Sequence, residues 1–113
     1  KSVGVERTLA EDILTKAQCQ EMVEQLFPKL LERIEKSRAQ QRIDSQGIKL
    51  KFSDFQQTTV EHKNRRLDKG YFYDLLDEAY ERKRGRGVRL VGLHVGLSSA
   101  EASYQYSLPF DSQ

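Results

Sequence analysis

Apolar and polar residues alternate in three segments of the chain, which is the pattern of strands buried on one face only. The segments are SVGVERTLAED at 2–12, IKLKF at 48–52 and VRLVGLHVGL at 88–97. A fourth strand is predicted in QQTTVEH at 56–62, after a short turn near 53–54 or a bulge. Because it contains few large apolar residues, it suits the edge of a sheet.

Two segments instead repeat apolar residues every three or four positions, as an amphipathic helix does. The first spans about 16–39, after a capping box formed by Thr15 and Gln18, and Pro28 is expected to kink or divide it. The second begins after Asp68 and continues to about Lys83, where the GRG sequence at 85–87 is expected to end it with a left-handed glycine. DSQG at 44–47 has the composition of a turn.

The predicted order is βαββαβ, an α+β arrangement of the ferredoxin-like type. Both helices can cover one face of a four-stranded sheet and leave the other face bare. Leu26, Leu30, Phe72 and Leu76 are predicted to pack against the sheet. The bare face would carry small, polar and basic residues. We therefore predict a folded domain over 1–97 and an extended tail over 98–113.

Composition adds a basic bias to this picture. The net charge of +2 includes two basic clusters, at 63–69 and 82–89, whereas the tail contains two acids and no base. Such clusters suit a polyanionic partner or a solvated surface. The single cysteine, Cys19, excludes an internal disulfide and favours a buried helix residue in an intracellular protein. No segment is apolar enough for a membrane span, and the start at Lys1 without a signal pattern suggests a piece of a longer protein.

No pattern typical of a catalytic or metal site occurs in the sequence. His62 and His94 have no ligand spacing to other donors, and the adjacent Glu11 and Asp12 would point apart on a strand. The GRG sequence is not a Walker loop. Its backbone amides and basic neighbours could hold a phosphate, or they could simply end the helix, and the two roles are compatible.

Three segments resemble a known family. KSVGVERT, GIKLKFSDFQQTT and GRGVRLVGLHV are similar to strands of the little finger domain of Y-family translesion DNA polymerases, of the bacterial DNA polymerase IV type. The resemblance implies an error-prone, magnesium-dependent DNA-directed DNA polymerase of the bacterial cytoplasm that acts in DNA damage tolerance. Its catalytic carboxylates would lie in the palm, outside this chain, so we expect no catalytic residue and no cofactor here.

The resemblance also implies that the bare face grips the primer–template DNA. Contacts to phosphates would hold DNA without reading its sequence. The residues expected to make them are Ser2, Gly4, Arg7, Thr8, Lys49, Lys51, Gln57, Thr58, Thr59 and His94, with Arg65, Arg84 and Arg86 at the edges.

The tail contains QYSLPF at 105–110, which resembles the binding motif for the bacterial sliding clamp, the beta subunit. Gln105 would hydrogen-bond at the rim of a cleft, and Leu108 and Phe110 would fill it. Pro109 favours the extended conformation that such a peptide needs. The alternative is that this apolar tail packs on its own domain.

Other functions are compatible with the same fold, since a fold alone does not define function. A ferredoxin-like regulatory or RNA-binding module is the main alternative. An RNA-recognition module would need exposed aromatic residues on the central strands, where this sequence has lysine, glycine and histidine. An isolated enzyme is the third possibility.

Overall fold

The computed structural model describes residues 2–13, 15–37, 41–64 and 66–99. The elements follow the order β1 (Ser2–Ile13), α1 (Lys16–Ser37), β2 (Gln41–Phe52), β3 (Gln57–Lys63), α2 (Lys69–Tyr80) and β4 (Val88–Ser99). The predicted βαββαβ order is therefore confirmed. β4 runs to Ser99, beyond the boundary predicted at 97, and the division between domain and tail stays a prediction.

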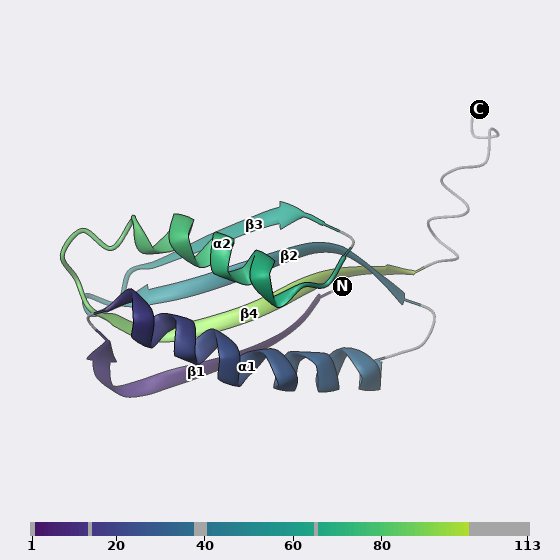
Figure 1. Ribbon diagram of the computed structural model, residues 1–113, viewed down its shortest axis with the longest axis horizontal. Helices are drawn as coiled ribbons and strands as arrows, with labels where there is room; N and C mark the ends of the chain where they lie inside the picture. Colours follow the sequence, from purple (N-terminus) through teal and green to yellow (C-terminus); the bar gives the residue numbers. More distant parts are fainter. Residues whose placement is uncertain (1, 14, 38–40, 65, 100–113) are drawn as a thin grey trace.

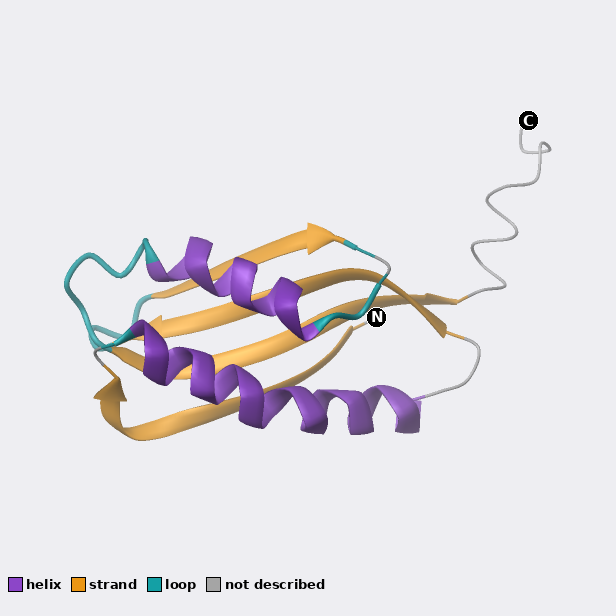
Figure 2. Ribbon diagram, in the orientation of Figure 1, coloured by secondary structure: helices purple, strands orange, loops and turns teal. Residues whose placement is uncertain are grey.

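The four strands form one antiparallel sheet in the order β1-β4-β2-β3 (Figure 1). β3 lies at an edge, as its composition predicts. Both helices lie on the same side of the sheet, α1 against β1 and β4 and α2 against β2 and β3 (Figure 2). One face of the sheet is thus covered by helices and the other is left open, as expected.

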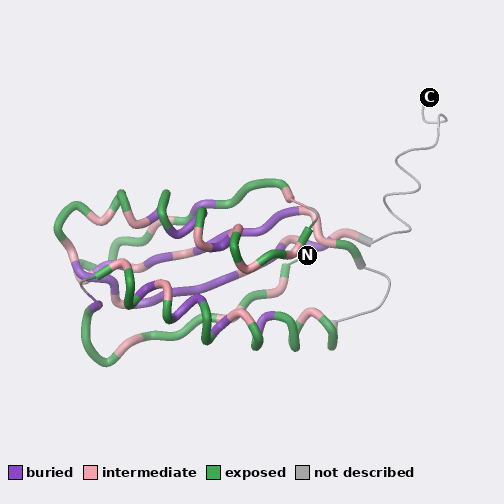
Figure 3. The backbone as a smooth tube through the Cα atoms, in the orientation of Figure 1, coloured by how far each residue is buried: buried purple, intermediate pink, exposed green. Residues whose placement is uncertain are grey.

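The core lies between the helices and the covered face of the sheet, and buried residues follow β2, β4 and the inward sides of the helices (Figure 3). All residues predicted to pack there are buried. The rings of Phe27 and Phe72 meet edge to face with centroids 5.9 Å apart, which joins α1 to α2. Cys19 is fully buried, as predicted, and burial raises the pKa of its thiol to about 11.

Both helix starts are confirmed. The Thr15 hydroxyl accepts the backbone N–H of Gln18 at 3.2 Å and donates to the Gln18 side chain at 3.0 Å. The Asp68 carboxylate accepts the backbone N–H of Gly70 at 3.0 Å. These bonds satisfy backbone donors that a helix leaves unpaired in its first turn.

Two predictions about the helices need correction. Of the two effects expected of Pro28, division of α1 is wrong, because the helix is continuous through it, and a kink stays a prediction. The proline is exposed, and so is Glu24, whose carbonyl loses its helical partner and can bind water instead. α2 ends at Tyr80, before the predicted Lys83, and two tight turns follow. In the second turn Gly85 has a positive φ angle, which confirms the left-handed glycine expected in the GRG sequence, and so has Arg84.

The turn predicted at 44–47 is wrong, because these residues belong to β2. The strand register shifts between Ile43 and Ser45, so that the chain accommodates Asp44 as an irregularity of the strand. Gln46 is fully buried there and donates to the backbone carbonyl of Arg66 at 2.5 Å. One of the polar residues that suggest a turn, Gln46, instead binds the segment leading into α2.

Candidate nucleic-acid interface

The face of the sheet opposite the helices, called here the open face, is defined by the strand register. Partners in neighbouring strands share a face, so four rows of four residues cross the sheet from β1 through β4 and β2 to β3. The rows are Ser2-Gly96-Ser45-Lys63, Gly4-His94-Gly47-Glu61, Glu6-Gly92-Lys49-Thr59 and Thr8-Leu90-Lys51-Gln57. Only Leu90 is a large aliphatic residue in this set, and it is buried. The open face is therefore polar and mixed in charge.

Two glycines let side chains of one strand cross over its neighbour. A Cβ on Gly47 would collide with the imidazole of His94, whose ring extends from β4 across β2. A Cβ on Gly92 would lie 3.2 Å from the Cβ of Glu6, beside the path between β1 and β2. Each glycine thus makes room for a contact between strands that are not adjacent.

The first such contact joins Lys49 of β2 to Glu6 of β1. The Lys49 Nζ lies 2.9 Å from the Glu6 Oε1, and the two side chains are 32% and 52% exposed. β4 lies between the two strands, at Gly92. This ion pair is accessible to solvent, so it is weak and can be displaced.

The second contact centres on Glu61 of β3. Its Oε1 lies 3.2 Å from the Nε2 of His94, and its Oε2 accepts the Ser45 hydroxyl at 2.6 Å. Both bonds lower the pKa of Glu61, the one from Ser45 more than the one from His94, so the carboxylate is ionised at neutral pH. Both carboxylate oxygens therefore have partners on the open face.

Most of the residues expected to contact DNA lie together on the open face. They are Ser2, Gly4, Thr8, Lys49, Lys51, Gln57, Thr59 and His94. Arg7 and Thr58 are on the covered face instead. Arg7 donates to the Gln25 side chain of α1 at 3.0 Å, and Thr58 accepts a bond from Arg82 at 2.6 Å. Strand alternation gives the reason, since Arg7 continues the side of Val5, and Thr58 the side of Val60.

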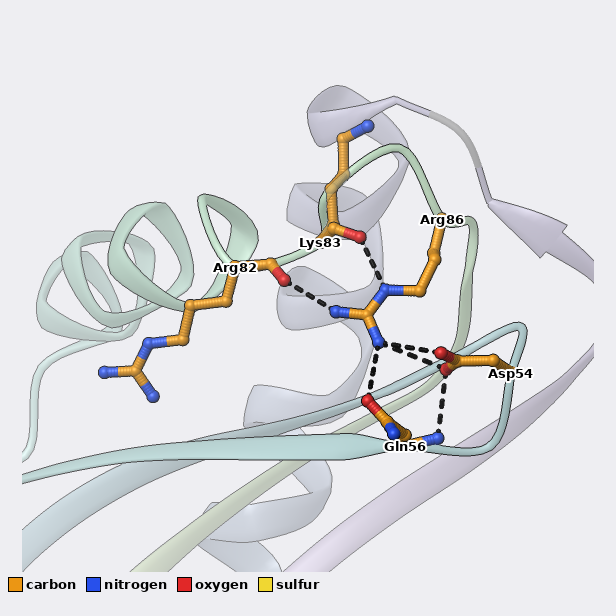
Figure 4. Close-up of polar contacts among 5 residues, drawn as sticks. All are labelled: Asp54, Gln56, Arg82, Lys83 and Arg86. Atoms are coloured by element: carbon orange, nitrogen blue, oxygen red, sulfur yellow. Dashed lines mark hydrogen bonds and ion pairs between the residues drawn. The ribbon is translucent and has the colours of Figure 1, made fainter.

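Arg86 lies in a separate cluster beyond the end of α2 (Figure 4). Its guanidinium donates to the backbone carbonyls of Lys83 at 2.7 Å and Arg82 at 2.8 Å. It also donates to the carboxylate of Asp54 at 3.0 and 3.2 Å and to the Gln56 side chain at 3.2 Å. Asp54 also accepts the backbone N–H of Gln56. This bond is the main cause of the lowered pKa of Asp54, and the Arg86 guanidinium lowers it further. Arg86 therefore closes the end of the helix and ties it to the β2–β3 turn.

The helix was expected to end at the GRG sequence, and the Arg86 side chain of that sequence donates to carbonyls in the turn that follows α2. Phosphate binding at the GRG sequence stays a prediction. Arg84 is exposed beside Gly85, whereas Arg65 and the clamp motif residues Gln105, Leu108 and Phe110 lie outside the described residues.

The open face also contains two acids that the sequence did not lead us to expect there, Glu6 and Glu61. Glu6 and Glu61 share the strand side of Gly4 and Thr59, so alternation alone could have placed them there. Their partners could not be predicted in the same way, because each contact depends on the spatial order of the strands.

The part of the chain that the structure describes contains neither a metal site nor a membrane-spanning helix. No group of three or more His, Cys, Asp or Glu in them could hold a metal ion. Nor is any helix among these residues both long and apolar enough to cross a membrane.

Comparison with known proteins identifies the family. Residues 1–108 match the impB/mucB/samB family C-terminal domain. The chain is 57% identical to DNA polymerase IV of Pseudoalteromonas atlantica, and the match covers 98% of this chain and 31% of the relative. It is 48% identical to DNA polymerase IV of Vibrio vulnificus, and that match covers 96% of this chain and 31% of the relative. The chain thus spans about a third of the length of these curated relatives.

Solved structures agree with this match. A complex of a beta-clamp processivity factor and the little finger domain of PolIV matches with a TM-score of 0.79 and 49% identity, over 84% of this chain and 86% of that one. A ternary complex of the polymerase Dbh shares the fold with a TM-score of 0.70 at 15% identity, over 85% and 29% of the two chains. The chain belongs to the impB/mucB/samB family C-terminal domains.

Proposed function

We propose that this domain binds primer–template DNA without sequence preference and tethers an error-prone translesion DNA polymerase to the bacterial sliding clamp. The open face is the observation that carries the DNA-binding part. It presents Lys49, Lys51 and Lys63 together with hydroxyl and amide side chains on one surface of the sheet. Lysine and small polar donors suit phosphates, which carry no sequence information.

The family supports the wider context of this proposal. Relatives three times as long are named DNA polymerase IV, and a similar little finger domain was solved with a beta clamp. The whole protein would then be a DNA-directed DNA polymerase of the bacterial cytoplasm. Magnesium would be bound by the rest of that polymerase, since the described residues offer no fitting set of ligands.

The open face does not favour the main alternative. An RNA-recognition module stacks bases on aromatic residues of its central strands. The central strands here, β4 and β2, present Leu90, Gly92, His94 and Gly96, and Ser45, Gly47, Lys49 and Lys51. None of these eight residues is a phenylalanine, tyrosine or tryptophan.

The test is a titration of the isolated domain with fluorescent duplex and primer–template DNA at several salt concentrations. We expect micromolar or weaker binding, equal for unrelated sequences, with log affinity falling by about 0.9 per phosphate contact for each tenfold rise in salt. Lys49→Ala with Lys51→Ala should weaken binding and flatten this dependence, because both lysines would contact phosphates.

The matched control removes two lysines from the helices. Lys16 pairs with Asp77 and Lys69 pairs with Glu24, both away from the open face. Lys16→Ala with Lys69→Ala changes the net charge equally and should weaken binding less. An affinity independent of salt, or equal loss in the two double variants, would contradict DNA binding by the open face.

A further inference from the structure

The open face contains its own competitors for phosphate. A side chain that binds DNA through an N–H group must present a free donor to a phosphate oxygen. In the free domain, however, the Lys49 ammonium lies 2.9 Å from the Glu6 carboxylate, and the His94 Nε2 lies 3.2 Å from that of Glu61. Two of the donors best placed to bind DNA are therefore already paired with acids.

These pairs are built into the sheet and are not chance contacts of long side chains. Each spans three strands and passes over a position occupied by glycine, Gly92 for the first pair and Gly47 for the second. Ser45 holds the second oxygen of Glu61 at 2.6 Å, which orients the carboxylate toward His94. Glu61 is ionised at neutral pH, because these bonds lower its pKa.

We propose that Glu6 and Glu61 set the DNA affinity of this domain by competing with phosphates for Lys49 and His94. The inference rests on the proposed DNA-binding function and adds two affinity-determining residues to it. Both pairs are solvent-accessible, with side chains 25–52% exposed, so a phosphate can displace the carboxylate. The displaced carboxylates remain near the DNA and repel it, which keeps the grip weak and reversible.

The competition predicts a gain of affinity from removing the acids. Glu6→Gln with Glu61→Gln keeps the shape of both side chains and removes both negative charges. We expect tighter binding to the same duplex by up to about fivefold for each acid, the equivalent of a surface ion pair. The salt dependence should also steepen, by up to about 0.9, because the Lys49 ammonium becomes free to exchange counterions for phosphate.

The control removes two paired acids from the helices. Glu24→Gln with Asp77→Asn eliminates the partners of Lys69 and Lys16 and changes the net charge by the same amount. A general charge effect would raise affinity equally in both double variants. We expect the gain to be larger for the variant on the open face, and equal gains would overturn the inference.

A double-mutant cycle tests whether Glu6 acts through Lys49. Glu6→Gln should increase DNA affinity less in a Lys49→Ala background than in the wild-type domain, because no lysine remains to be released. An undiminished gain would overturn the competition for Lys49. Wild-type binding with no gain in the Glu6→Gln, Glu61→Gln variant would refute this inference alone, whereas absence of binding by both proteins would refute the proposed function as well.

Discussion

At the scale of single residues, position on a strand decides which basic groups can meet DNA. Arg7, Lys49 and Arg86 are all cations in or near the sheet, yet each has a different environment. Arg7 contacts α1, Lys49 lies on the open face, and Arg86 is bound by backbone carbonyls and Asp54. A count of basic residues therefore overstates the number that could contact phosphates.

Arg86 is expected to contribute to stability. Arg86→Ala removes donors to two backbone carbonyls and a guanidinium that lies 4.2 Å from the centre of the Phe52 ring. The free energy of unfolding should fall by about 1–3 kcal/mol, because the Arg82 carbonyl loses its donor and the contacts to Asp54 and the Phe52 ring are lost. Arg86→Lys should recover only part of it, since an ammonium lacks the planar fork of donors.

Urea unfolding of the two variants beside Arg84→Ala would measure this effect. Arg84 is exposed and only two positions away, so its loss should change stability by less than about 0.5 kcal/mol. Equal destabilisation by Arg84→Ala and Arg86→Ala would show that the cluster in Figure 4 has no special role.

At the scale of elements, alternation and helical spacing are sufficient to predict most of the fold. They identify five of the six elements, and composition adds β3. They also assign the faces of β2 and β4, because a strand with one buried face needs a strict period of two. The pattern fails at 44–47, where a strand irregularity and a buried Gln46 replace the expected turn. Turn-like composition cannot reveal that a polar side chain has a partner distant in the sequence.

The candidate site shows the same limit. Eight of the residues expected to contact DNA do share a face, but the contacts of Glu6 with Lys49 and of Glu61 with His94 were missed. Both contacts require the strand order β1-β4-β2-β3, with the last strand inserted between the first and second. Local patterns say nothing about that order.

The assignment of faces can be tested by substitution. Leu93 is 1% exposed on the covered face of β4, whereas Lys51 lies on the open face of β2. Leu93→Ala should lower the free energy of unfolding by about 2–5 kcal/mol, through lost burial and the cavity that remains. Lys51→Ala should cost well under about 1 kcal/mol, because its side chain is partly exposed.

Chemical denaturation of the two variants provides the measurement, and Val95→Ala is a second test of the covered face. Val95 is fully buried and pairs with Val3 of β1. Similar stability losses for Leu93→Ala and Lys51→Ala would mean that the two faces have been assigned wrongly.

At the scale of the whole molecule, charge divides the chain into two parts with different expected partners. Basic residues occur along the folded part, and residues 98–113 contain Glu101 and Asp111 and no base. A segment of this composition is repelled by DNA phosphates. If the proposed function is correct, DNA and the clamp are therefore bound by different parts of the chain, and each affinity can be changed without the other.

Removal of residues 104–113 tests this separation. We expect it to abolish binding to a bacterial sliding clamp, because the few apolar anchors of such a peptide contribute most of the binding energy. Leu108→Ala with Phe110→Ala should have nearly the same effect, and Gln105→Ala a smaller one. The melting temperature and the DNA affinity should stay nearly unchanged, since the sheet and helices already bury their apolar faces against each other. Calorimetric titration of the clamp with intact and truncated chains, beside thermal unfolding of both, gives the comparison. Unchanged clamp affinity together with a melting temperature lower by many degrees would show that the tail packs on its own domain and that the clamp hypothesis is wrong.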